Sequence, residues 1–140
     1  MMIRTIAASL FALSLLTTGA EAQGGKKHKE PEFDGRPLSA WIADLKAPAP
    51  YSRNIAAYAI SGMGAEGAPA VPALIVALDD PEAAVRFPVC VALREIGPAA
   101  KDAIPALTKA LEDRSDDVAS MARKALRSIT GTDPRPPENN

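Results

Sequence analysis

The sequence predicts an all-α fold, an α-α superhelix or short α-solenoid, in which three pairs of helices stack on one another. The chain has 140 residues, and its apolar pattern recurs with a period of about 33 residues. The equivalent positions of three successive units are Leu45, Leu78 and Leu111; Trp41, Leu74 and Leu107; Ile60, Leu93 and Leu126; and Met63, Ile96 and Ile129. A unit of this length holds two short helices but closes no core alone, so neighbouring units must cover its apolar side. We expect units at about 37–66, 67–99 and 100–131.

The outer two units have clear helix signals. In the first unit, apolar residues at helical spacing predict helices at 38–45 and 51–63. In the third unit, Asp102 is expected to cap the first helix. The second helix is expected at 116–129, with Gly131 after its end.

The second unit contains an exception to ordinary helix chemistry. Its first helix is expected at about 69–78, with Asp80 as the cap of the following helix and Pro81 as that helix's first residue. Pro88 lies two turns further on and lacks the N–H group that would bond to the carbonyl of Ala84. We therefore expect a bend at Pro88.

The last unit differs from the others at one buried position. Arg123 takes the place that Ala57 and Cys90 hold in the first two units. Small residues there suit a surface between stacked units, so Cys90 is expected to be buried and inert. A charged residue suits a terminal unit with nothing stacked on it. We therefore expect no fourth unit, and residues 132–140 are expected to form a polar, proline-rich tail.

The second unit resembles a known repeat. The stretch AVPALIVALDDPEAAVR, from Ala70 to Arg86, resembles a HEAT repeat in its short, phycobilisome-lyase-like form. The resemblance extends over about 37–131, although Ala119 stands in the third unit where Arg53 and Arg86 stand in the first two. It implies a superhelical scaffold, because proteins built from such repeats are only rarely enzymes.

Four charged residues recur at equivalent turns. Asp80 and Asp113 lie one period apart, as do Arg53 and Arg86. Repeats of the resembled family use such pairs to tie adjacent turns together. The resemblance therefore implies that these four residues form a structural ladder along the solenoid.

The amino-terminal segment is typical of an exported protein. Within residues 1–22, Arg4 supplies a positive charge, 6–16 form an apolar run, and a small-residue cleavage signal ends at Ala22. A run of about 11 residues is too short to cross a membrane, which takes roughly 20. We expect a signal peptide, no stable membrane anchor after its cleavage, and a periplasmic or extracellular protein. Residues 23–36 are expected to form a flexible basic arm.

Composition argues against several functions. The chain has 16 basic and 17 acidic residues, which gives no general attraction to nucleic acid. Its one histidine, His28, falls in the arm, so neither a Ser/His/Asp constellation nor a multi-histidine metal site can be assembled. We expect no metal, no cofactor and no catalytic residue.

The outward side of the second helices is the expected binding surface. A helical wheel places aromatic, apolar and basic residues on this side, which is concave in the resembled family, and Asp117 lies there too. The expected contact residues are Tyr51, Asn54, Tyr58, Phe87, Val91, Arg94, Lys124 and Arg127. Clustered exposed apolar side chains usually mark a contact surface, although the arm, through Phe33, or the tail could instead cover them.

Two functions are consistent with these features. The first is an exported, noncatalytic HEAT-repeat scaffold or adaptor, monomeric, that binds a protein or an extended, partly acidic peptide on its concave face. The alternative is a lyase-like or chaperone-like protein acting on a prosthetic group such as a bilin. A bound chromophore or a deep apolar cavity would favour the alternative.

Overall fold

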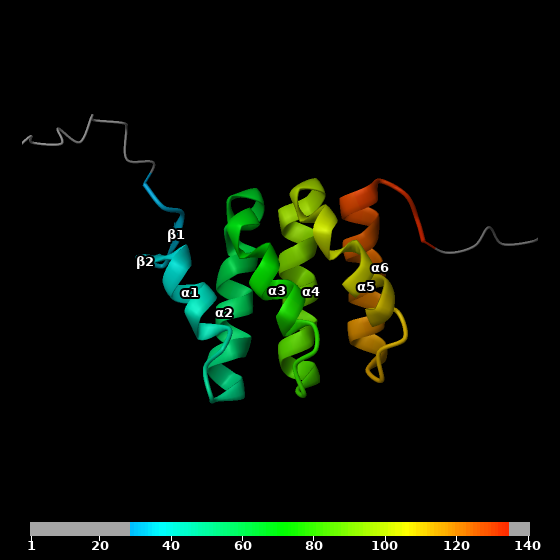
Figure 1. The fold of residues 1–140 in the computed structure, drawn as a ribbon, viewed down its shortest axis with the longest axis horizontal. Coiled ribbons are helices and arrows are strands. Elements are labelled where there is room, and N and C mark those ends of the chain that lie inside the picture. The colour runs from blue at the N-terminus through cyan, green and yellow to red at the C-terminus, as the bar shows by residue number, and fades with distance from the viewer. Residues whose placement is uncertain (1–28, 135–140) are drawn as a thin grey trace, which may run out of the picture.

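Three helix pairs in a row make up the described protein. The computed structural model describes residues 29–134. The pairs are α1 (Leu38–Asp44) with α2 (Pro50–Gly62), α3 (Val71–Ala77) with α4 (Ala83–Ile96), and α5 (Ile104–Ala110) with α6 (Asp116–Thr130). Figure 1 shows the longer second helices α2, α4 and α6 standing side by side, with the first helices α1, α3 and α5 forming the other row. The predicted all-α solenoid is confirmed.

The core lies between the two rows of helices. Most of the repeating apolar positions are buried, whereas Met63 and Leu111 are half-buried. Alanines such as Ala57, Ala92 and Ala122 are fully covered, which lets the second helices approach closely. Cys90 is also buried, as predicted.

A short 3-10 helix links each helix pair to the next, a feature that the sequence reading missed. The two segments are η1 (Gly64–Ala70) and η2 (Gly97–Ala103), and each opens at a glycine with positive φ. Helix α3 begins at Val71, two residues after the predicted start and with Pro72 in its first turn. The predicted Asp102 cap is wrong, because α5 begins at Ile104 and no side chain caps it. Each 3-10 helix runs directly into the next α-helix, so that the N–H of Ile104, for example, donates to the carbonyl of Lys101. No side-chain cap is needed there.

The predicted start of α4 is also wrong. The helix begins at Ala83, and Glu82 precedes it in an extended conformation. The carboxylate of Asp80 instead accepts a hydrogen bond of 3.0 Å from the N–H of Glu82. Asp80 and Pro81 therefore form the turn before the helix, because a short acidic side chain can bond to the backbone two residues further on.

Pro88 lies inside a helix that continues through it. Its ring is fully buried, and α4 runs from Ala83 to Ile96 without interruption. The carbonyl of Ala84, which has no helical donor at Pro88, accepts a hydrogen bond from the side-chain amide of Asn54. Asn54 on α2 thus replaces the bond that proline removes from α4.

A short hairpin, which the sequence did not predict, includes residues 32–36 of the predicted basic arm. β1 (Glu32–Phe33) pairs antiparallel with β2 (Arg36–Pro37). Asp34 and Gly35 connect the strands with φ of 52° and 72°. Positive φ at both central residues is the geometry of a tight hairpin turn, and Asp-Gly is one of its preferred sequences.

This hairpin covers the first helix pair. The indole N–H of Trp41 donates to the carbonyl of Phe33 at 3.3 Å, and the Arg36 guanidinium lies 3.9 Å from the centroid of the Trp41 ring. The Phe33 ring packs against Gly62, where an added Cβ would lie 2.9 Å from Cδ2 of the ring. Glu30 accepts a hydrogen bond from the N–H of Ser39 at the start of α1. The hairpin therefore takes the place of a preceding repeat.

At the other end, α6 ends at Thr130, and Gly131 caps it in the left-handed conformation, as predicted. Arg123 is half-buried on this last helix. The predicted signal peptide at 1–22, the arm residues 23–28 and most of the tail lie outside the described residues. No helix within residues 29–134 is long and apolar enough to cross a membrane.

Candidate functional site

The four predicted ladder residues form two ion pairs between successive turns. Arg53 holds Asp80 through two hydrogen bonds, Nε to Oδ2 at 2.6 Å and Nη2 to Oδ1 at 3.1 Å. Arg86 holds Asp113 in the same way, with both bonds at 2.8 Å. Bidentate pairs of this kind fix geometry as well as adding energy.

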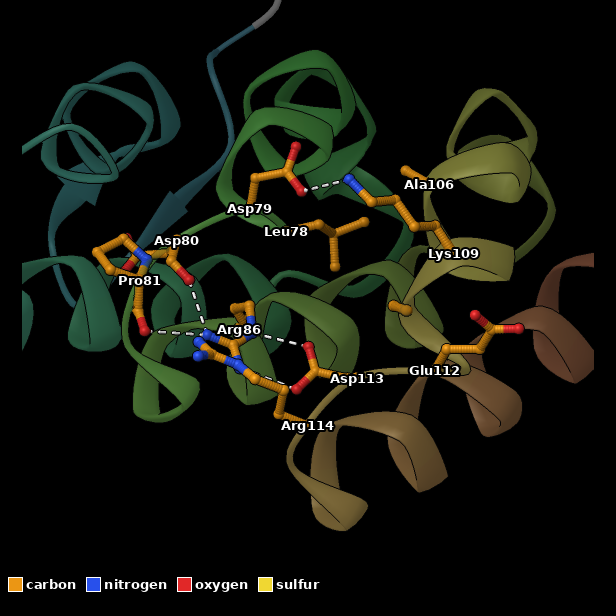
Figure 2. A pocket seen from close by; sticks show the side chains of 11 residues that line it. Leu78, Asp79, Asp80, Pro81, Arg86, Ala106, Lys109, Glu112, Asp113 and Arg114 are labelled. Atoms are coloured by element: carbon orange, nitrogen blue, oxygen red, sulfur yellow. Dashed lines mark hydrogen bonds and ion pairs between the residues drawn. The ribbon is translucent and has the colours of Figure 1, made fainter.

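Each ladder arginine also closes its own turn. Nη1 of Arg86 donates to the carbonyls of Asp80 and Pro81 at 2.8 and 3.1 Å, as Figure 2 shows beside the pair with Asp113. Arg53 makes the equivalent bonds to the carbonyls of Ala47 and Pro48. One guanidinium therefore ties the turn of its own unit to the turn of the next.

The ladder keeps its carboxylates ionised. The hydrogen bonds from Arg86 lower the pKa of Asp113 and outweigh the effect of burial. Burial alone would raise the pKa of Asp80, but the hydrogen bonds from Arg53 and from the N–H of Glu82 more than offset it and the pKa is lowered. Hydrogen bonds to the charged form favour that form.

A first hollow lies along the ladder. Its volume is about 400 Å³, and it lies between the turn that holds Asp79 and Asp80 and the turn that holds Glu112 and Asp113. Figure 2 shows Lys109 reaching across it to Asp79, at 3.3 Å. Its charged groups are thus largely paired with one another. Within residues 29–134 no group of three or more acidic, histidine or cysteine side chains is placed to hold a metal ion.

A second hollow lies on the outward side of α2, α4 and α6, which we call the second-helix face. It is an open groove of about 490 Å³. Its lining residues are Asn54, Tyr58, Ala83, Ala84, Phe87, Ser115 and Asp117. The groove therefore crosses all three units near the start of α4 and α6.

The structure places only part of the predicted contact set in this groove. Tyr58, Phe87 and Asn54 line it, and Tyr58 keeps 45% of its surface exposed. Tyr51 is 75% exposed, lies about two turns before Tyr58 on α2 and does not line the groove. Val91 is half-buried further along α4.

Two predicted contact residues turn out to have structural partners. The side-chain amide of Asn54 donates one N–H to the carbonyl of Ala84, which leaves its carbonyl oxygen and its second N–H for a ligand. Arg94 bonds to Glu95 and directs Nη1 toward the sulfur of Met121 at 3.7 Å. Helical spacing alone does not predict the bond of Asn54 to Ala84 or the bonds of Arg94 to Glu95 and Met121.

The predicted basic end of the face is also less positive than its composition indicates. Arg127 forms an ion pair with Asp133, and Arg94 is paired with Glu95. Lys124 is exposed and makes no ion pair within the part of the chain that the structure describes. Lys124 is thus the cation best placed to meet an acidic ligand.

Sequence reasoning left Ser115 and Asp117 out of the contact set. Asp117 lies on the outward side of the helical wheel, so the signal was present, but an acidic residue in a first helical turn is ordinarily explained by the helix dipole. Ser115 is the cap of α6, and its hydroxyl accepts from the N–H of Val118. The alternative cover, Phe33, packs at Gly62 and does not line the groove.

Comparisons with known proteins agree with this architecture. A family model described as HEAT repeats matches residues 38–127. The crystal structure of an engineered protein is similar, with a TM-score of 0.60 and 21% sequence identity, over 67% of this chain and 45% of that chain. This chain thus spans less than half of the engineered protein, and the likeness is one of fold. No curated protein matches the chain.

Proposed function

The chain belongs to the HEAT-repeat family, and from this membership and the groove we propose that it is a noncatalytic scaffold, exported from the cytoplasm, that binds an extended segment of a protein partner on the second-helix face. HEAT repeats generally serve as noncatalytic scaffolds for protein binding. The further claims, export and the place of binding, rest on the features set out below.

The exposed aromatic side chains beside the groove are the observation that carries the proposal. Tyr51 and Tyr58 remain 75% and 45% exposed, whereas Ala56, Ala57, Ala59 and Ile60 of the same helix are buried in the core. Tyr58 on α2 and the half-buried Phe87 on α4 both line the groove. Aromatic residues dominate binding energy at protein interfaces, and an aromatic anchor beside a hollow suits an inserted side chain.

The chemistry of the single cysteine supports a noncatalytic role. Cys90 is fully buried, and its pKa is raised to about 12, first by burial and then by the nearby charge of Asp113. A thiol with such a pKa is not a nucleophile near neutral pH. The scaffold is proposed to work without a cofactor.

Export is proposed from residues 1–22, which have the composition of a signal peptide. The test is the mass and amino-terminal sequence of the protein recovered from its native cell, with its compartment. We expect a chain that begins at Gln23 in the periplasm or the medium. A cytoplasmic protein that retains residues 1–22 would refute export without affecting the binding proposal.

The binding proposal is tested with random 12-residue peptides displayed on phage and selected on the purified protein. Selected peptides, labelled with fluorescein, are then titrated with variants of the protein. Phe87→Ala should weaken binding about thirtyfold, because truncating a central aromatic anchor commonly costs 2 kcal/mol or more. Val76→Ala is the matched control, since Val76 is an apolar residue that is 68% exposed on α3, in the other row. Peptides that lose affinity with Val76→Ala but not with Phe87→Ala would refute the second-helix face as the binding surface.

A further inference from the structure

The groove on the second-helix face has an acidic and aromatic lining. Tyr58 and Phe87 contribute aromatic rings, and Asp117 contributes the only charged side chain of the lining. Asn54 donates one amide N–H to the carbonyl of Ala84, and its carbonyl oxygen remains able to accept. The charge of the groove lining is therefore negative, and it lies in one groove with two aromatic rings.

Asp117 differs from the acidic residues around it. Asp80 and Asp113 are held by the ladder arginines, and Asp79 is paired with Lys109. The carboxylate of Asp117 has no ion pair or side-chain hydrogen bond with any residue from 29 to 134. The helix dipole of α6 favours an acidic residue at position 116 as well as at position 117. Of these two residues, Asp117 lines the groove and Asp116 does not.

A carboxylate beside aromatic rings is complementary to one kind of side chain. A guanidinium or ammonium group binds the ring faces through cation-π attraction and the carboxylate through a charge-assisted hydrogen bond. The aliphatic stem of Arg or Lys covers apolar surface at the same time. An acidic or an apolar side chain in this groove would leave the Asp117 charge unpaired.

We propose that the groove binds a Lys or Arg side chain of the partner segment, an inference that rests on the proposed function and specifies the chemistry of its site. The arrangement also sets the spacing of charges in that segment. Lys124 lies two turns beyond Asp117 on α6, about 10 Å along the helix axis. An extended chain covers that distance in about three residues. The partner segment therefore has its basic residue about three positions from an acidic one.

The test uses the selected 12-residue peptides and two protein variants. The peptides should share a Lys or Arg, and its replacement by Gln should weaken binding about tenfold. Asp117→Asn should weaken binding of the parent peptide to a similar degree and should remove most of the effect of the Gln replacement. Asp116→Asn is the matched control, because it removes a neighbouring charge outside the groove, and it should change the affinity less than twofold.

A second measurement separates this inference from the proposed function. N-acetyl-arginine amide is titrated into the protein and followed by NMR, with N-acetyl-norleucine amide as the uncharged control. We expect shifts at Tyr58, Phe87 and Asp117 with the arginine probe alone. If peptides lose affinity with Phe87→Ala yet ignore Asp117→Asn, and both probes act alike, the inference fails while the proposed function stands. If no peptide responds to Phe87→Ala but the arginine probe shifts the groove, the proposed function fails and the cation site stands.

The chain's own basic residues are the competing occupant. Lys26 and Lys27 lie outside the described residues and could supply the cation in place of a partner. Replacing both with Gln should leave the affinity for the selected peptides unchanged. An increase of tenfold would show that the amino-terminal segment occupies the groove and would overturn the assignment to a partner.

Discussion

Arg86 ties the turn of the second unit to the turn of the third. Replacing it with Met keeps an aliphatic side chain of similar length but removes the guanidinium. Four hydrogen bonds disappear with that group, two to the carboxylate of Asp113 and two to the carbonyls of Asp80 and Pro81. Oδ1 of Asp113 keeps a hydrogen bond from the N–H of Ser115, but the carboxylate loses both bonds from the guanidinium.

The expected loss of stability is large for a protein of this size. The side chains of Arg86 and Asp113 are only 7% and 11% exposed. Removing one partner of such a covered pair costs about 3 kcal/mol, because the remaining carboxylate keeps its desolvation penalty. Small domains are stable by only about 5–15 kcal/mol. A loss of 3 kcal/mol corresponds to a Tm lower by about 15 °C.

Urea unfolding followed by circular dichroism measures the change, and a double-mutant cycle with Asp113→Asn assigns it. Asn can still accept the hydrogen bond that the N–H of Ser115 donates to Asp113 at 2.9 Å. The two single variants should each be less stable, and the double variant should be more stable than their sum predicts by about 2 kcal/mol. Additive losses would show that the two side chains do not act as a pair.

The difference between the parent and Arg86→Met should depend on pH. The pKa of Asp113 in the folded protein lies below its ordinary value of 3.8, chiefly because of the hydrogen bonds from Arg86. A carboxyl of this kind stabilises the fold above its unfolded pKa, and the stabilisation is lost as pH falls through the folded pKa. The difference should therefore be full above about pH 5 and shrink toward pH 2. A difference below about 0.5 kcal/mol at pH 7, or one that does not change with pH, would refute the role of the ladder.

Three further outcomes are expected. Asn54→Ala should lower stability by about 1 kcal/mol, and by less in a Pro88→Ala background, where residue 88 regains an N–H for the carbonyl of Ala84; equal losses in urea unfolding would contradict this replacement of the bond. Cys90 should react with Ellman's reagent only as fast as the protein unfolds, since its thiol is buried with a pKa raised to about 12, and rapid reaction of the folded protein would be inconsistent with that burial. Lys124→Ala should weaken peptide binding at low salt and much less at 0.5 M NaCl, and an effect that ignores salt would argue against a charge contact.

The sequence predicted the fold well because the fold depends on a repeated pattern. Burial of positions such as Leu74, Leu93 and Leu107 needs only the period and the helical spacing, both of which are visible along the chain. The links were predicted less well, because η1 and η2 contain alanines and prolines that read equally as loop or helix start. The hairpin was missed because Asp34-Gly35, its turn signal, lies in a polar segment with few strand formers.

The candidate site was predictable in place but not in detail. Helical geometry alone places Tyr58 and Phe87 on one side of their helices. It does not tell which polar neighbours are already engaged, and this decides the chemistry of the groove. Asn54 is engaged because of Pro88, and Arg127 because the chain after α6 brings Asp133 to it. Such pairings depend on contacts between segments whose separation in sequence follows no repeat.

The ladder and the groove are parts of one arrangement. The carboxylate of Asp113, held by Arg86, accepts from the N–H of Ser115, and Ser115 forms a wall of the groove two residues before Asp117.

The opposite wall is built in the same way. The carboxylate of Asp80, held by Arg53, accepts from the N–H of Glu82 just before Ala83 and Ala84. Each wall is thus held through an aspartate, and the arginine that binds this aspartate lies 27 residues earlier in the chain. Preorganised walls lower the entropy lost when a side chain enters, so the same arginines that stabilise the stack also favour binding in the groove.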